Sequence, residues 1–324
     1  MKIYKVGDEF YSKSLQEGHS SHRLFPQREL WMMEHIKNIE VVTQANADAK
    51  DVDALWIDNP IYFTEDVEKL DLPVVFDAID WYAEMAVKEG RFDVLDSLHE
   101  GSLKLSKYNK LALVSQSPLV EGYFIRNVGV RPKIRSVIPN GYDEDIHKFS
   151  PMGAGEHVLF FAGKLGRWYS NLVYFIEVVK NMKEWELVVA GDGEMLNYFM
   201  KVAGDCPRIH FLGFVDVDRV AKEITNSDVC IFPVDDCSPI VVSEYMACGR
   251  PVVNIGGRLS WLVRDSKDGF CLASPYDLKR YIKIAYDYRE YMGASARDRI
   301  APYSWSNNVR KFEDVVKELV EVCG

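Results

Sequence analysis

Short apolar runs alternate with longer amphipathic stretches along most of the chain. Compact runs rich in β-branched residues are typical of buried strands, whereas apolar residues spaced three and four apart are typical of helices. Strands that alternate with helices predict βαβ units and parallel sheets, and therefore an α/β fold. The expected strands are 2–6, 40–43, 54–57, 73–76, 111–115, 136–138, 157–162, 186–190, 208–212, 229–232, 251–254 and 269–272.

A turn cluster divides this pattern into two halves. Residues 139–143 read Pro-Asn-Gly-Tyr-Asp, and a second series of strands and helices begins beyond a linker at about 141–156. We therefore expect two Rossmann-like domains, at 1–145 and 146–300. The last segment, 301–324, contains a helix with one apolar stripe, which can pack onto either domain.

The stretch 229–253 predicts a strand, a loop, a short helix and a second strand. Ser238 is suited to cap this helix and Pro239 to occupy its first position, and Gly249 ends it. The N–H groups at such a helix N-terminus can bind a phosphate.

Two carboxylates accompany this helix, Asp236 before it and Glu244 within it. Carboxylates accept hydrogen bonds from hydroxyl groups, so the combination suits a nucleotide-sugar. A capped structural helix with a solvated Glu244 explains the same local features.

The same stretch resembles the signature of retaining glycosyltransferases of GT-B fold, in the family-4-like group called glycosyl transferases group 1. That signature has an acidic residue, seven others, and then the Glu of a Glu-(Ala or Tyr)-Met-Ala-x-Gly-x-Pro-Val-Val run. Asp236 and Glu244 match its acidic positions, and residues 244–253 match the run. The resemblance implies two Rossmann-like domains facing across a cleft, with a C-terminal helix that crosses back to the first.

The resemblance also implies an activity. The chain would be a hexosyltransferase-type enzyme (EC 2.4) that moves a sugar from a nucleoside-diphosphate sugar to an acceptor, with retention of configuration and without a metal or other cofactor. The first domain would lie on the acceptor side and the second would bind the donor. The acceptor class stays open between a glycan, a lipid-linked sugar, a protein and a small molecule.

Individual roles follow from the resemblance. Glu244 would bind ribose hydroxyls and Asp236 a sugar hydroxyl. Lys164 matches a family Arg that holds the diphosphate. The second family cation falls on uncharged Ser170, for which Arg167 could substitute from the same loop. Further donor contacts are expected from these positions: Gly163, Gly191, Val215, Ser238, Pro239, Ile240 and Val241. Gly191 also has a structural explanation, because its turn needs glycine.

In the first domain, the expected strand 73–76 leads to Asp77, Asp80 and Trp81. Carboxylates beside an aromatic ring suit a sugar, and we favour Asp80 over Asp77 as the catalytic-site residue, with Trp81 as a binding residue. An N-cap role explains either Asp equally well.

Composition narrows the possible partners. The net charge is −10 with no long basic run, which argues against nucleic acid and against a polybasic membrane patch. Six cysteines without a C-x-x-C pair, and no apolar leader or run of membrane-span length, predict a cytoplasmic protein without an integral membrane segment. His19 and His22 form an H-x-x-H without further ligands, so no metal site is expected.

Two other functions remain open. The uncharged Ser170 favours a non-catalytic GT-B-like protein that binds a nucleotide or glycan. A GT-B sugar-nucleotide epimerase would act without an acceptor. The sequence identifies neither the donor sugar, the base nor the oligomeric state.

Overall fold

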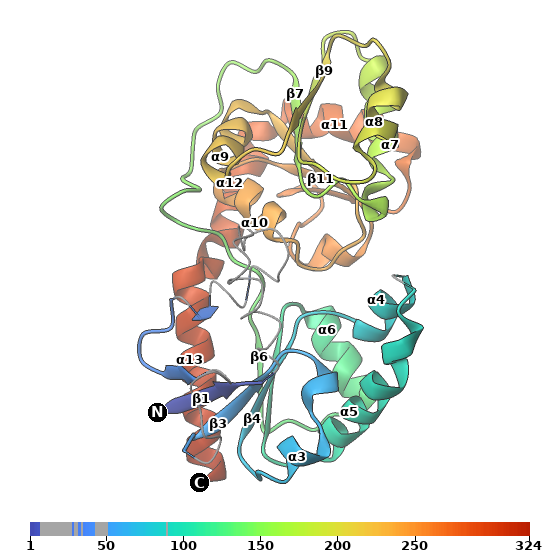
Figure 1. Ribbon diagram of the computed structural model, residues 1–324. Helices are drawn as coiled ribbons and strands as arrows, with labels where there is room; N and C mark the ends of the chain where they lie inside the picture. The colour runs from blue at the N-terminus through green and yellow to red at the C-terminus, as the bar shows by residue number, and fades with distance from the viewer. Residues whose placement is uncertain (7–27, 29–31, 34, 43–50, 89) are drawn as a thin grey trace. The chain divides into compact units, whose positions relative to one another are not determined.

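The computed structural model describes residues 1–6, 28, 32–33, 35–42, 51–88 and 90–324, which form two compact units (Figure 1). The first unit contains residues 1–139 and 305–324, and the second contains residues 140–304. Each unit holds one six-stranded parallel sheet with helices, so the predicted α/β fold with two Rossmann-like domains is confirmed. The chain passes from one unit to the other at 139/140 and returns at 304/305. The sequence analysis placed these boundaries at 145/146 and 300/301.

The first sheet has the strand order β2-β1-β3-β4-β5-β6. Its central strands, β3, β4 and β5, are buried along their whole length, as expected where helices cover both faces of a parallel sheet. The strands are β1 (Lys2–Lys5), β2 (Glu40–Val42), β3 (Ala54–Ile57), β4 (Val74–Ala78), β5 (Leu111–Ser115) and β6 (Ile134–Val137). The α-helices between them are α3 (Glu65–Glu68), α4 (Tyr82–Lys88), α5 (Leu95–Lys107) and α6 (Pro118–Tyr123).

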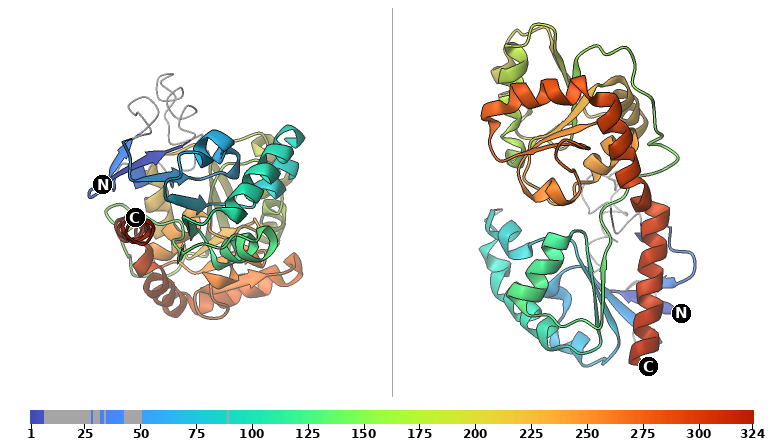
Figure 2. Two further views of the ribbon diagram at one scale, coloured as in Figure 1. Left: turned by 90° about the horizontal axis from the view of Figure 1, so that it is seen from below. Right: turned by 180° about the vertical axis from the view of Figure 1, so that it is seen from behind.

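The last helix, α13 (Trp305–Cys323), belongs to the first unit. Figures 1 and 2 show it running beside the strands of this unit. Its apolar stripe packs on one face of the sheet, and the Phe312 ring centroid lies 4.8 Å from that of Trp56 in β3. The stripe that was compatible with either domain therefore completes the core of the first.

The second sheet has the strand order β12-β11-β10-β7-β8-β9. Its strands are β7 (Val158–Ala162), β8 (Glu186–Ala190), β9 (Ile209–Gly213), β10 (Val229–Phe232), β11 (Val252–Ile255) and β12 (Gly269–Leu272). The α-helices are α7 (Leu172–Lys180), α8 (Leu196–Ala203), α9 (Val217–Asn226), α10 (Ile240–Ala247), α11 (Leu278–Asp287) and α12 (Arg289–Ile300).

The direction of strand progression in the second sheet reverses between β7 and β10. Strands β8 and β9 extend the sheet on one side, and β11 and β12 extend it on the other. In doubly wound sheets, ligands bind beyond the carboxyl ends of the strands at such a reversal. The loops that follow β7 and β10 are therefore the place to look for a site.

None of the helices in the described part of the chain combines the length and the apolar character needed to cross a membrane.

Candidate functional site

The loops after β7 and β8 are each hydrogen-bonded to the end of the next strand in the sheet. Gly163 N donates to Ala190 O at 3.0 Å, and Gly191 N donates to Gly213 O at 2.7 Å. Gly191 has φ +143°, and a Cβ there would lie 1.9 Å from Gly163 O. Only glycine fits this close approach. Gly191 therefore shapes the neighbouring loop, whatever contact it also makes with a ligand.

Two cations lie on the loop after β7. Lys164 is exposed, and its side-chain ammonium has no ion-pair or hydrogen-bond partner among the described residues. Arg167 is also exposed, and its Nε lies 3.4 Å from Glu194 Oε1. A 3₁₀ turn at Arg167–Tyr169 follows this loop, and α7 then runs from Leu172 to Lys180. Ser170 is exposed between these two elements and brings no charge.

The start of α10 differs from the prediction. Pro239, with extended backbone at ψ 133°, is the N-cap, so Ser238 is not the cap and Pro239 is not the first helical residue. The Ser238 hydroxyl instead accepts a hydrogen bond from Asn140 N at 3.0 Å, and Asn140 Nδ2 donates to Ser238 O at 2.5 Å. The Ile240 and Val241 N–H groups have no hydrogen-bond partner in the described part of the chain. They are available to an anion.

Asp236 lies in the loop before α10, half-buried. Its Oδ1 accepts a hydrogen bond from Ser238 N at 3.1 Å. Burial raises the pKa of the Asp236 carboxyl, while the N–H groups of Ser238 and Cys237 oppose the rise. Burial also raises the pKa of Tyr169 to about 12, and the charge of Asp236 adds to that rise. The loops after β7 and β10 therefore converge, with Tyr169 from one near Asp236 from the other.

Glu244 lies in the middle of α10, with its side chain 17% exposed. Its Oε1 is 3.8 Å from Nε2 of His147. Burial raises the pKa of the Glu244 carboxyl, and nearby His147 lowers it while Asp143 raises it. The next residue, Tyr245, accepts a hydrogen bond from Ala162 N at 2.8 Å, which fixes α10 against the end of β7.

Val215 follows β9 and is half-buried, next to exposed Phe214. Gly213, with φ +65°, turns the chain toward them. Asp216 then caps α9 by accepting from Arg219 N at 2.8 Å. Val215 thus lies at the same carboxyl-end edge of the sheet as the loops after β7 and β10.

The candidate carboxylates of the first unit lie in different environments. Asp77 is fully buried in β4 and forms an ion pair with Arg28, whose Nη2 lies 2.9 Å from Asp77 Oδ1. Asp77 is therefore a structural residue. Asp80 is half-buried in the loop beyond β4, and its Oδ1 accepts from Trp81 N at 2.7 Å. Asp80 and Trp81 remain together at the carboxyl end of β4.

The sequence analysis did not identify Asn140, Asp143 and His147, because it interpreted residues 139–143 as a turn and residues 141–156 as a linker. These three residues lie in the second unit and contact α10 or groups beside it. The Pro-Asn-Gly turn was the available signal, since Asn140 is the residue that holds the start of α10.

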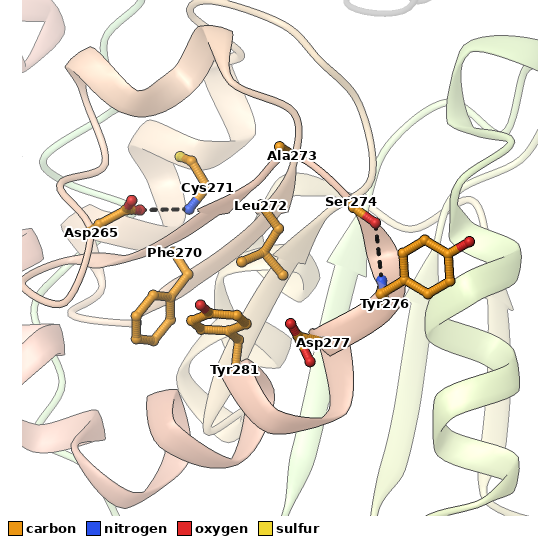
Figure 3. Close-up of a pocket in the computed structure, with 9 residues that line it drawn as sticks. All are labelled: Asp265, Phe270, Cys271, Leu272, Ala273, Ser274, Tyr276, Asp277 and Tyr281. Carbon is orange, nitrogen blue, oxygen red and sulfur yellow. Dashed lines mark hydrogen bonds between the residues drawn. The ribbon is translucent and has the colours of Figure 1, made fainter.

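A separate pocket of about 230 Å³ lies at the carboxyl end of β12 (Figure 3). Its polar groups are partly used within the pocket, where Asp265 accepts from Cys271 N and Ser274 accepts from Tyr276 N. No predicted site residue lines it. It is lined by Asp265, Phe270, Cys271, Leu272, Ala273, Ser274, Tyr276, Asp277 and Tyr281.

Among the residues that the structure describes, no group of three or more His, Cys, Asp and Glu side chains is placed to hold a metal ion. His19 and His22 lie outside the described residues.

Comparisons with known proteins find relatives of the second unit and of the fold. The family described as Glycosyl transferases group 1 matches residues 156–286. An uncharacterized glycosyltransferase from Methanocaldococcus jannaschii is 28% identical over 188 residues, which cover 52% of this chain and 47% of that protein. The alignment thus spans about half of the archaeal relative.

Solved structures share the fold. HepE from Anabaena, solved in complex with UDP, has a TM-score of 0.71 and 17% identity over 98% of this chain and 100% of that chain. Sucrose-phosphate synthase from Thermosynechococcus elongatus has a TM-score of 0.69 and 16% identity, covering 84% of this chain and 74% of the other. The fold is therefore GT-B, as predicted.

Proposed function

Because residues 156–286 match the family described as Glycosyl transferases group 1, we propose that the chain is a hexosyltransferase-type enzyme that moves a sugar from a nucleoside-diphosphate sugar to an acceptor. The observation that carries this proposal is the convergence of two loops at the strand-order reversal of the second sheet. There, the open N–H groups of α10 follow the carboxylate of half-buried Asp236. A diphosphate needs such donors, and sugar hydroxyls need such acceptors.

The donor diphosphate would be held by Lys164, by Arg167 and by the N–H groups of Ile240 and Val241. These groups would stabilise the charge that develops on the leaving diphosphate, and they would do so without a metal. The partner-free ammonium of Lys164 and the open helix N-terminus support this role.

Glu244 would accept hydrogen bonds from ribose hydroxyls, and Asp236 from a hydroxyl of the transferred sugar. Both are carboxylates removed from bulk water, where hydrogen bonds are stronger than at an exposed surface. Backbone at Gly163, Gly191 and Val215 would complete the donor contacts. The match of Asp236 and Glu244 to the family signature supports transfer with retention of configuration.

In the first unit, Asp80 and Trp81 keep their proposed role as sugar-binding residues. Asp80 is the better candidate, because Asp77 is committed to Arg28. The acceptor is proposed only as a hydroxyl-bearing molecule.

The test is calorimetric titration of the protein with UDP, GDP and ADP, with and without EDTA, followed by turnover of the matching nucleotide-sugar. UDP is the first probe, because HepE was solved with it. EDTA-insensitive binding and turnover are expected. Binding abolished by EDTA would contradict metal independence, and no binding of any of the three nucleotides would contradict the donor site.

Glu244→Ala should lower kcat/KM about 10- to 100-fold, since a hydrogen bond to a charged group contributes about 1.5–3 kcal/mol. Glu186→Ala is the matched control, because Glu186 begins β8 at the opposite end of the sheet. Equal kcat/KM in the two variants would contradict the role of Glu244.

A non-catalytic nucleotide-binding protein is the second candidate, favoured by the uncharged, exposed Ser170. It predicts nucleotide binding that Glu244→Ala weakens, together with no turnover of any nucleotide-sugar in the presence of a broad panel of acceptors.

A further inference from the structure

His147 is a buried histidine beside Glu244 in the second unit. Its side chain is 1% exposed, and neither ring nitrogen has a hydrogen-bond partner among the described residues. A polar group that is buried without a hydrogen bond destabilises the fold. Its closest charged neighbour is the Glu244 carboxylate, with Nε2 and Oε1 3.8 Å apart. The position of His147 therefore indicates a function that involves Glu244.

The backbone around His147 holds the ring in position. His147 N donates to Asp143 O at 2.8 Å, and Asp143 Oδ1 accepts from Asp145 N at 2.8 Å. The same segment is bound to α10 on both sides of Glu244. Ser243 Oγ donates to Asn140 O at 2.9 Å, and Ser150 N donates to Cys248 O at 3.4 Å. The distance between His147 and Glu244 is thus set by two elements that are bonded to each other.

The other charged and titratable groups around Glu244 do not neutralise it. Asp143, from the segment that carries His147, raises the pKa of the Glu244 carboxyl and so opposes its ionisation. Tyr245 and Cys248, on α10 itself, have pKa values raised mainly by burial and further by Glu244. From α12, Arg297 donates to Ala247 O at 3.0 Å and lies over the Tyr142 ring. His147 is the one basic group within ion-pair distance of Glu244 in the described part of the chain.

We propose that His147, as an imidazolium, is the counter-ion that keeps Glu244 ionised and ready to accept hydrogen bonds from the donor nucleotide. It is a positioning residue, because it acts through Glu244. The inference rests on the proposed role of Glu244 in donor binding. The separation of 3.8 Å is longer than a hydrogen bond, so the attraction in this structure is between charges. The lowering of the pKa of Glu244 by His147 agrees with this role.

The first arm of the test needs no ligand. The side-chain carboxyl carbon of Glu244 is followed by ¹³C NMR against pH, and its signal is assigned by its loss in Glu244→Gln. His147→Phe keeps a ring of similar volume, and His147→Gln keeps a hydrogen-bond donor without a charge. Both variants should move the midpoint upward by about one pH unit, a tenfold change in the ionised-to-neutral ratio.

The matched control is His210→Phe. His210 lies 3.4 Å from Glu186 in an exposed pair of the same unit, and its loss should leave the Glu244 midpoint unchanged. An unmoved midpoint in both His147 variants would overturn the inference. If the Glu244 midpoint moves in His147→Phe but not in His147→Gln, the counter-ion role is overturned as well. A neutral hydrogen-bond donor would then be sufficient to keep Glu244 ionised.

The second arm measures UDP binding by calorimetry on both sides of the midpoint. On the acid side, His147→Phe should bind UDP about tenfold more weakly than the unmodified protein, and on the alkaline side within about twofold. A shifted midpoint with unchanged UDP affinity would support the counter-ion and overturn the donor-binding role of Glu244. The failure of the inference and the failure of the proposed function are therefore distinguishable.

Discussion

Lys164 and Arg167 are both exposed cations, but they differ in their partners. Arg167 Nε is 3.4 Å from Glu194 Oε1, whereas the ammonium of Lys164 has no partner among the described residues. Exposed ion pairs contribute only about 0–1 kcal/mol, so Arg167 can be recruited to a ligand at small cost. Lys164 needs no such exchange, and it also matches the family's diphosphate position. We therefore propose that Lys164 would contribute the larger share of the diphosphate interaction.

Lys164→Ala should weaken UDP binding by about tenfold, in the range of a charge-assisted hydrogen bond. Calorimetry at low salt measures the change, and added salt should reduce the difference, because salt screens exposed charges. Lys183→Ala is the control, since Lys183 is an exposed lysine just before β8, at the far end of the sheet. A larger loss in Arg167→Ala than in Lys164→Ala would reverse this assignment.

The raised pKa of Asp236 predicts that the stability of the protein depends on pH. Burial raises the pKa of this carboxyl above its ordinary 3.8, so the folded state favours the neutral form. The ionised carboxylate is then a disadvantage to folding at neutral pH, and the disadvantage disappears as the pH falls through the raised value. Asp236→Asn should raise the melting temperature at pH 7.

The melting-temperature difference between Asp236→Asn and the unmodified protein should shrink in scans from pH 8 to pH 5. Asp265→Asn, at an exposed carboxylate, controls for the change in net charge. A difference that grows toward acid would contradict the direction of the pKa shift.

At the scale of elements, the sequence predicted buried strands better than helix ends. The bounds of β3, β5, β8, β10 and β12 agree with the prediction, because strands buried on both faces read as uninterrupted apolar runs. The start of α10 was misplaced because the Ser238 hydroxyl is taken by Asn140, which lies 98 positions earlier in the chain. A local capping rule contains no information about such a partner.

The candidate site was predictable from the sequence only where its residues lie in one local motif. Asp236 and Glu244 stand in one short motif, so their spacing is visible in the sequence. His147 was not visible as a site residue, since its relation to Glu244 depends on how residues 140–150 fold along α10. Residues that contribute through a long-range contact need the structure to be recognised.

Gly191 lies in the turn after β8, where the added methyl group of an alanine should destabilise the protein. Gly191→Ala would place a Cβ 1.9 Å from Gly163 O, on a backbone at φ +143°, so the loops after β7 and β8 must separate. We expect a loss of at least about 2 kcal/mol in the free energy of unfolding, together with weaker UDP binding. Chemical denaturation and calorimetry measure both quantities. Gly257→Ala, where a Cβ meets nothing within 4 Å, should change neither.

At the scale of the whole molecule, the first unit is built from both ends of the chain. Residues 1–139 form its sheet, and α13 supplies Val309, Phe312, Val315, Val316 and Leu319 to its core. The second unit is continuous, from 140 to 304. A substitution that weakens the packing of α13 should therefore destabilise the first unit.

Phe312→Ala should destabilise the first unit by about 3–5 kcal/mol, since it removes a fully buried ring packed on Trp56. Amide hydrogen exchange followed by mass spectrometry can resolve the two units. Exchange should accelerate in β3, β4 and β5 and remain slow in β7, β8 and β10. Phe92→Ala, at an exposed ring of the first unit, is the control. Uniform acceleration in both units would contradict an assignment of α13 to the first unit alone.

The division of the first unit between the two ends of the chain has a consequence for its synthesis on the ribosome. Domains usually fold in the order in which they emerge. Here the sheet of the first unit emerges early, but Trp56 cannot pack on Phe312 until about 250 further residues have been translated. The second unit, whose residues are contiguous, has all its strands available before that point. The nascent chain is thus expected to complete its second unit first. Until the chain is almost fully translated, the apolar face of the first sheet lacks α13.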